Sequence, residues 1–321
     1  MVDSVMKNIF FNEDNQREFS RKGYTIIPFL SDEETDFLLN ETCKLLPLDK
    51  ILLNANNGVT LGSHTTFLDS DVDYKTAANK LINDLFDPKI KEILIDYKIA
   101  VSGFVVKPGQ CGEVGLHRDW TLTRNIDDVR INLWCPLVDI DQSNGILHIL
   151  DGAHRLVLNV ESPYTTQFHC GYTESLKKLT TAVSVKAGQV LVFDNSILHW
   201  SRANTTSDTR YVAATLCIPT DAKPAFYYPD EKNEGRRFQV FDMDGEAFLQ
   251  HSMADYYSCN IRARSLGFVE NKNKVVSQDE FLRLLSNGDK VRQGTYSLAK
   301  GANSGSFLTR LKRLFDLSSQ S

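Results

Sequence analysis

Apolar residues recur at helical intervals through most of the first third of this 321-residue sequence. A capping-box spacing begins at Ser31 and an apolar stripe follows it, which predicts a helix. A second helical stretch is expected over about 74–97, where Pro88 should break it into two helices. A short β-rich run, 24–29, precedes both. We therefore expect residues 1–97 to form a helical N-terminal layer.

From residue 98 the pattern changes to short runs of β-branched and aromatic residues separated by turn residues. Because no long helical stretch lies between these runs, they predict a sandwich or barrel over residues 98–220. The interval 157–180 lacks periodicity, and a loop of that length in an all-β core is typical of a lid or binding loop. The expected strands are 100–106, 129–140, 146–150, 181–185, 190–193 and 211–218.

After residue 220 the periodic signal fades. The run 226–229 is aromatic and turn-like, and the segment 230–237 is charged. Helical spacing of apolar residues returns at 307–317, which predicts a small docking helix. We expect residues 221–321 to be a C-terminal extension of the β-rich core.

The composition narrows the class of protein. The 18 Phe and 11 Tyr can bury a sizeable core, and 36 basic against 41 acidic residues argue against a nucleic-acid-binding protein. No apolar run approaches the roughly 18 to 20 residues that cross a bilayer, and no signal peptide is recognisable. The six cysteines form no CxxC pair and are interpreted as buried thiols of a reducing compartment. We expect a cytoplasmic protein without a membrane span.

His117 and Asp119 are the strongest candidates for residues of a metal site. In extended backbone, residues i and i+2 point to the same face, so these two side chains can converge. Together they make two thirds of a 2-His-1-carboxylate triad, which holds Fe(II) on one face and leaves the other positions open. Alone, such a pair is a weak signal, because His-x-Asp tripeptides occur by chance on many surfaces.

His199 strengthens this interpretation. It ends a strand-like apolar run that begins at Gly188, where a hydrogen-bonded core histidine is the alternative to a metal ligand. Ser201 should share its face, and Arg210 should return near it after a turn, by a hairpin or by crossing between two packed sheets. A buried arginine needs an anion, and its planar fork suits a carboxylate. Beside a three-ligand metal, these residues fit a dicarboxylate co-substrate.

The ordered set resembles the phytanoyl-CoA dioxygenase family of iron(II)- and 2-oxoglutarate-dependent oxygenases. The resemblance covers about residues 20–220, with 82 positions from the first histidine to the second and 11 more to the arginine. Its motifs are His117-x-Asp119, the runs 144–155 and 187–193, His199, Ser201 and Arg210. It implies a double-stranded β-helix, a jelly roll, with flanking helices.

The resemblance also implies roles for the matching residues. His117, Asp119 and His199 would bind iron, Arg210 would pair with the far carboxylate of 2-oxoglutarate, and Ser201 would hydrogen-bond it. One catalytic domain would oxidise an unactivated C–H bond of a small organic substrate with O2, releasing succinate and CO2. The expected reaction is hydroxylation, and desaturation and oxidative ring closure are variants of the same chemistry. A non-catalytic regulatory protein on the same barrel, or a cupin-type metal hydrolase or isomerase, are the alternatives.

Several further residues are candidates for the pocket or for packing. Arg118 stands where the family commonly has Gln, and it could alter the substrate side of the pocket. We expect substrate to be selected by the segment 157–180, with Tyr164, Phe168 and Tyr172, and by the aromatic run 226–228. Lys107 could face an anion or solvent. Trp120, Thr121, Asn132 and Trp134 could line the pocket, whereas packed or exposed roles are expected for His64, His148, His154, His169 and His251.

Overall fold

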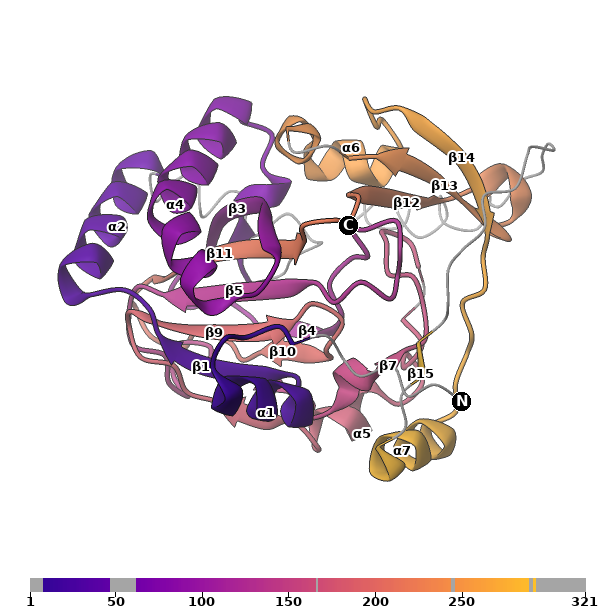
Figure 1. Ribbon diagram of the computed structural model, residues 1–321, viewed down its shortest axis with the longest axis horizontal. Helices are drawn as coiled ribbons and strands as arrows, with labels where there is room; N and C mark the ends of the chain where they lie inside the picture. The colour runs from indigo at the N-terminus through magenta and orange to yellow at the C-terminus, as the bar shows by residue number, and fades with distance from the viewer. Residues whose placement is uncertain (1–7, 47–61, 166, 244–245, 289–290, 293–321) are drawn as a thin grey trace, which may run out of the picture.

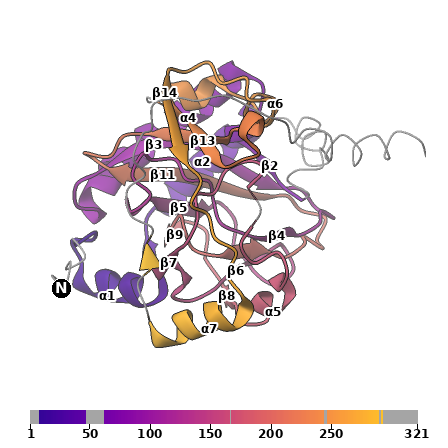
Figure 2. The ribbon, with the colours of Figure 1, turned by 90° about the vertical axis from the view of Figure 1, so that its right-hand side faces the viewer.

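The computed structural model describes residues 8–46, 62–165, 167–243, 246–288 and 291–292. Its centre consists of two antiparallel sheets that pack face to face (Figures 1 and 2). The larger sheet contains β1 (Tyr24–Pro28), β2 (His64–Thr65), β3 (Tyr97–Lys107), β5 (Ile131–Pro136), β9 (Gln189–Asp194) and β11 (Arg210–Pro219). The smaller sheet contains β4 (Val114–His117), β6 (Leu147–Ile149), β8 (Thr181–Val183) and β10 (His199–Ser201).

The order of the strands identifies the architecture. The larger sheet runs β1-β9-β5-β11-β3-β2 and the smaller runs β4-β10-β6-β8. Along the chain, β3, β5, β9 and β11 of the larger sheet alternate with β4, β6 and β10 of the smaller one, so the chain crosses repeatedly between the sheets. This is a double-stranded β-helix, and the predicted fold is confirmed.

Neighbouring residues of the central strands point to opposite sides of the larger sheet. On β9, Val190 and Val192 belong to the core beneath the helices, whereas Leu191 and Phe193 belong to the core between the sheets. Because both faces are buried, these strands carry continuous apolar runs rather than an alternating pattern. The six expected strands accordingly correspond to β3, β5, β6, β8, β9 and β11.

The run that leads to His199 is not one strand. The strand β9 ends at Asp194, a turn follows, and His199 begins β10 in the other sheet. Since Arg210 begins β11 in the larger sheet, the chain crosses between packed sheets at this point instead of forming a hairpin.

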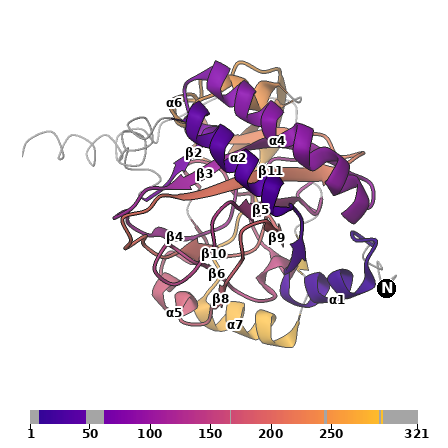
Figure 3. The same ribbon diagram turned by 90° about the vertical axis from the view of Figure 1, so that its left-hand side faces the viewer.

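Helices of the N-terminal region cover the outer face of the larger sheet (Figure 3). They are α2 (Asp32–Leu45) and α4 (Val72–Ile93), with the short 3-10 turn η1 (Thr66–Leu68), whereas α1 (Glu13–Lys22) lies beside the edge strand β1. Ser31 forms the expected capping box at the start of α2, and β1 pairs with β9 at the sheet edge.

The predicted break at Pro88 is wrong, because α4 continues through it. Pro88 lies on the exposed side, so the carbonyl that loses its helical partner can be hydrated. Phe86 and Ile90 are buried on either side of it, and their packing against the sheet outweighs the local cost of the proline.

The C-terminal region adds a third sheet, β12 (Ala225–Pro229), β13 (Arg237–Asp242) and β14 (Ser265–Glu270). The prediction of a turn at 226–229 is wrong: β12 is buried along almost its whole length, which removes the alternation that would have marked a strand. The shorter elements are η2 (Ala153–Arg155), β7 (Leu156–Val157), α5 (Thr173–Lys177), η3 (Glu231–Asn233), η4 (Ala247–Gln250), α6 (Met253–Ser258), α7 (Gln278–Asn287) and β15 (Val291–Arg292). The helix predicted over 307–317 lies outside the described residues.

The six cysteines differ in how exposed they are. All six cysteines are free, but only Cys135 and Cys217 are buried, and Cys43 and Cys170 are exposed, so the prediction of uniformly buried thiols is wrong. A sequence pattern of scattered cysteines says nothing about which face of a helix or loop each one occupies. Among the described residues, no helix has the length and apolar character to cross a membrane.

Candidate metal and co-substrate site

The structure brings His117, Asp119 and His199 together between the two sheets. His117 ends β4, His199 begins β10, and the two residues are opposite each other in the paired strands. Their potential ligand atoms and one carboxylate oxygen of Asp119 all lie within 4.8 Å of one another. Nε2 of His117 is 3.6 Å from Oδ1 of Asp119, and Nε2 of His199 is 4.0 Å from the same oxygen. This geometry is that of a metal-ligand group.

Hydrogen bonds orient all three side chains. Nδ1 of His117 donates to the carbonyl of Gly115 (2.7 Å) and Nδ1 of His199 to the carbonyl of Ile197 (3.1 Å), so each Nε2 is the ring nitrogen that binds a cation once it carries no proton. Oδ2 of Asp119 accepts from two amides, at 2.6 Å and 3.2 Å, so that Oδ1 faces the histidines. The amides belong to Asn132 on β5 and Asn195 in the turn after β9.

The three groups adjust one another's pKa values. Burial opposes protonation of His117, but the hydrogen bond and charge of Asp119 prevail and raise its pKa. Burial, with the charge of His117, lowers the pKa of His199 to about 4. Burial also opposes ionisation of Asp119, but the charge of His199 and the hydrogen bond from His117 outweigh it and lower the pKa of that carboxyl. An ionised carboxylate and a neutral His199 are the forms that a cation requires.

Arg210 lies in the same cavity, whose volume is about 780 Å³. Its side chain is 2% exposed, Nη1 donates to the carbonyl of Gly145, and the guanidinium lies 5.3 Å from the centre of the Trp134 ring. In the described part of the chain no carboxylate pairs with it, and its Nε has no hydrogen-bond partner. Burial lowers its pKa to about 10, so it remains charged at neutral pH. Ser201 lines the same cavity and is buried.

Lys107 lies opposite Arg210 in the β3–β11 pair and faces neither an anion nor solvent. It is fully buried, and its amine donates to the carbonyls of Gly112 and Arg202, both at 2.7 Å. Burial and, second, the charge of Arg210 lower its pKa to about 7. Lys107 therefore braces the loops around the arginine.

Some of the other candidate residues line the cavity, and the rest pack against other parts of the protein. Trp120, Asn132 and Trp134 line the cavity, whereas Thr121 exchanges hydrogen bonds with the backbone of Glu161. Arg118 lines it too, but its guanidinium donates to the carbonyl of Leu156. The remaining histidines contact protein groups: His148 stacks on Trp200, and His64, His154, His169 and His251 are buried.

The expected selectors of substrate lie near the cavity only in part: Gln167 of the segment 157–180 lines it, and the ring centre of Tyr164 is 5.1 Å from that of the lining residue Tyr257. Phe168 and Tyr172 pack against Phe281 of α7, and the aromatic run on β12 lies behind the cavity wall. The lining also includes Phe67 of η1 and Tyr257 of α6, which sequence reasoning did not single out. No local pattern marks these two residues, because they reach the site through contacts between distant segments.

Comparison with known proteins adds a family and a fold. The phytanoyl-CoA dioxygenase family model matches residues 19–212. Phytanoyl-CoA dioxygenase 1 of Oryza sativa subsp. japonica is 29% identical over 119 residues, which are 36% of this chain and 42% of that protein. Phytanoyl-CoA dioxygenase domain-containing protein 1 of Danio rerio is 30% identical over 140 residues, 39% of this chain and 48% of that protein. The chain thus spans less than half the length of these curated relatives.

Among solved structures, the non-heme alpha ketoglutarate dependent carbocyclase SnoK from nogalamycin biosynthesis has the same fold. The two superpose with a TM-score of 0.54 at 18% identity, over 67% of this chain and 86% of that one.

Proposed function

This chain belongs to the phytanoyl-CoA dioxygenase family, and from that premise we propose that it is an iron(II)- and 2-oxoglutarate-dependent oxygenase. The substrate is a small organic molecule with an unactivated C–H bond, and the proposed outcome is hydroxylation. One atom of O2 enters the substrate as the new hydroxyl, and the other enters succinate as 2-oxoglutarate loses CO2. Desaturation or oxidative ring closure would use the same site.

The observation that carries the proposal is the coexistence of two features in one cavity. Three metal-ligand side chains converge there, and a buried, charged arginine lies beside them without a carboxylate partner among the described residues. A buried charge is costly unless a ligand pairs with it. A dicarboxylate that also reaches the metal would satisfy both features at once.

The residues present fit the absent groups. Two imidazole Nε2 atoms and one carboxylate oxygen match the ligand set of non-haem Fe(II), with the orienting hydrogen bonds described above. Iron held by His117, Asp119 and His199 would supply the oxygen chemistry. Arg210 would bind the far carboxylate of 2-oxoglutarate through its fork, and the hydroxyl of Ser201 would hydrogen-bond it.

The protein's own contribution is positioning and exclusion of water. Asn132 and Asn195 hold Asp119 in one orientation, and the ring of Trp134 flanks Arg210, which keeps its guanidinium aimed at the cavity. The site lies between the two packed sheets, and the side chains of His117 and Asp119 are 32% and 31% exposed. We propose that the chain acts as a single catalytic domain, with 98–220 as its core, 1–97 as its helical layer and 221–321 as its extension. Its six free cysteines are consistent with a reducing compartment such as the cytoplasm.

The alternatives predict different behaviour. A regulatory protein on this barrel would bind iron and 2-oxoglutarate without turnover, and a cupin-type hydrolase or isomerase would have no need for the buried Arg210. The test is release of succinate from 2-oxoglutarate with iron(II) and O2, measured in the wild type and in His117→Ala and Asp119→Ala. We expect slow succinate release without substrate that both substitutions abolish. Full activity in both variants would refute the proposed function.

A further inference from the structure

The cavity has two chemically different ends, set by positions along β11. Arg210 begins this strand, and Leu216 follows six positions later, which corresponds to about 20 Å at roughly 3.3 Å per residue. Both residues line the cavity. Asp119 is hydrogen-bonded to Asn132, which is the register partner of Leu216. Asp119 therefore lies near the Leu216 end, where the cavity has a second space away from the arginine.

Aromatic and aliphatic side chains line this second space. Phe67, Trp120 and Tyr257 form what we call the aromatic wall: the centre of the Trp120 ring is 6.1 Å from that of Phe67 and 6.3 Å from that of Tyr257. Trp120 directly follows the ligand Asp119. The lining on this side also contains the apolar residues Leu68, Val101, Leu122 and Leu216. Ser102 and Thr215 line the cavity beside them, and their hydroxyl groups are hydrogen-bonded to each other at 2.8 Å.

The charged side chains of the lining are already engaged elsewhere. Besides the three ligands and Arg210, the described lining contains Arg118 and Glu113. Arg118 donates to the backbone and lies over the ring of Phe168, 4.6 Å from its centre. Glu113 pairs with Lys177 at 2.6 Å. A charged group of a substrate placed at the aromatic wall would therefore lose its hydration without gaining a partner.

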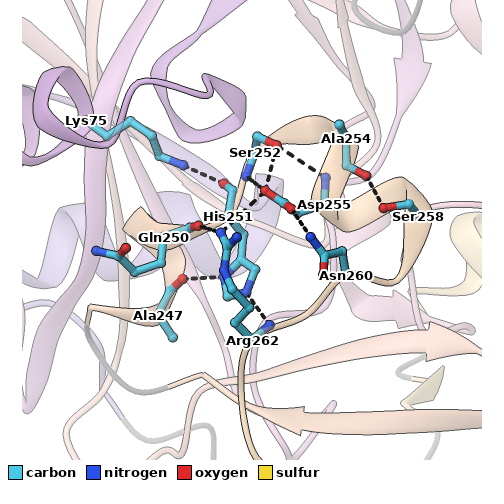
Figure 4. A network of polar contacts seen from close by, with 10 residues as sticks. All are labelled: Lys75, Ala247, Gln250, His251, Ser252, Ala254, Asp255, Ser258, Asn260 and Arg262. Carbon is cyan, nitrogen blue, oxygen red and sulfur yellow. Dashed lines mark hydrogen bonds and ion pairs between the residues drawn. The ribbon is translucent and has the colours of Figure 1, made fainter.

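A polar network fixes the segments that flank α6, the helix that carries Tyr257 (Figure 4). Lys75 of α4 donates to the carbonyl of His251 (2.5 Å), and Nε2 of His251 accepts from the backbone N–H of Arg262 (2.7 Å). A capping box between Ser252 and Asp255 fixes the start of α6, the helix that carries Tyr257. These contacts join the C-terminal region to the N-terminal helical layer.

The neighbouring Tyr256 stacks on Phe67, with ring centres 5.4 Å apart, so α6 also packs directly against the wall. A side chain whose helix is fixed on two sides is preorganised for binding, because little conformational freedom is lost when a ligand arrives. The family match ends at residue 212, so this preorganised element lies beyond the matched segment.

We propose that the substrate presents an uncharged apolar ring to the aromatic wall, and that Tyr257 determines this specificity. The inference rests on the proposed function and names the class of substrate for the same site. A cavity of about 780 Å³ has room for a drug-sized ligand, and flat rings gain from offset or edge contacts with Trp120 and Tyr257.

The test is calorimetric binding of two isosteric probes, neutral 2-naphthamide and anionic 2-naphthoate, without oxygen and with iron(II) and 2-oxoglutarate present. We expect the wild type to bind the amide at least tenfold more tightly than the carboxylate. Tyr257→Ala should weaken binding of the amide roughly 3- to 10-fold, and Tyr257→Phe should retain it. Phe37→Ala, which removes an exposed ring on α2 outside the cavity, is the matched control and should bind the amide like the wild type.

Each outcome decides a separate point. Equal binding of the two probes, or equal affinity of the wild type and Tyr257→Ala for the amide, would overturn the inference. Tyr257→Leu, which removes the ring and keeps apolar volume, replaces the alanine variant if that one does not fold. Release of succinate by the wild type is measured in the same preparation. If succinate is released but the amide does not bind, this inference fails alone; if no succinate is released, the proposed function fails.

Discussion

The two ends of the cavity differ in why their residues are buried. At the polar end, Arg210 is 2% exposed, and burial of a cation without a partner has no benefit for the fold itself. At the aromatic end, Phe67, Trp120 and Tyr257 are apolar or mostly apolar, and packing alone would bring them together. The buried charge at the polar end therefore directly supports binding of an anionic co-substrate. The aromatic end supports binding of a substrate only because it lies beside the proposed metal-binding side chains.

Lys107, the buried neighbour of Arg210 in the β3–β11 pair, differs from it although both side chains are basic. Lys107 satisfies its amine with two carbonyl groups, whereas Arg210 retains a donor without a partner among the described residues. The difference supports a structural role for Lys107 and the proposed co-substrate role for Arg210. Substitutions at the two ends should consequently affect different ligands.

The largest effect is expected between the two ends, at the metal ligands. Asp119→Ala removes the only carboxylate of the group, so iron affinity and succinate release should fall by at least roughly 100-fold. Iron binding is measured by equilibrium dialysis, and succinate by chromatography. Asp139→Asn, at an exposed carboxylate paired with Lys186, is the control and should behave like the wild type. Undiminished iron binding in Asp119→Ala would place the metal elsewhere.

At the polar end, Arg210→Met should weaken binding of 2-oxoglutarate without weakening binding of iron. Loss of one partner of a buried charged pair corresponds to an affinity decrease of roughly 30-fold or more. Iron affinity should not change, since Arg210 is not a ligand. The KM for 2-oxoglutarate and the iron dissociation constant separate the two effects. Arg236→Met, at an arginine whose side chain is 70% exposed, serves as the control. An unchanged KM in Arg210→Met would contradict the assigned role.

Asn132→Leu tests whether the amide of Asn132 orients the carboxylate of Asp119. The amide of Asn132 donates to Asp119 at 2.6 Å, and its loss should reduce iron affinity about 10-fold, less than loss of the carboxylate itself. The same dialysis measurement detects it. An effect as large as that of Asp119→Ala would mean that Asn132 does more than orient the carboxylate.

Behind the aromatic end, Lys75→Met should change stability with pH rather than ligand binding. Burial lowers the pKa of Lys75 to about 8, whereas the unfolded chain has the ordinary value of 10.5. Between these values the folded protein releases a proton that the unfolded chain retains, so wild-type stability should rise with pH. Below pH 8 both states carry the charge and the cost of its burial is present in full.

This prediction is checked by urea unfolding of the wild type and Lys75→Met at pH 7.5 and pH 10. The wild type should gain stability relative to the variant at the higher pH. Parallel behaviour of the two proteins would show that Lys75 is not buried as a cation, and would weaken the case that α6 is held in place by this network.

The contrast between the ends also explains what the sequence could predict. His117 and Asp119 are two positions apart on one strand end, and Arg210 is a charged residue at the start of an apolar strand, so local patterns point to both. Tyr257 contacts Trp120 across 137 positions of the chain, and no local pattern records such a contact. The role of Asn195 as a donor to Asp119 was not predicted, because Asn195 lies in a turn. The strand β12 was not predicted, because both of its faces are buried.

A crystal structure with iron(II) and 2-oxoglutarate, grown and measured without oxygen, tests the central claim most directly. The account predicts one iron ion bound by Nε2 of His117, Oδ1 of Asp119 and Nε2 of His199, with the far carboxylate of 2-oxoglutarate on the guanidinium of Arg210. A metal bound by other residues, or a 2-oxoglutarate whose far carboxylate lies away from Arg210, would contradict it.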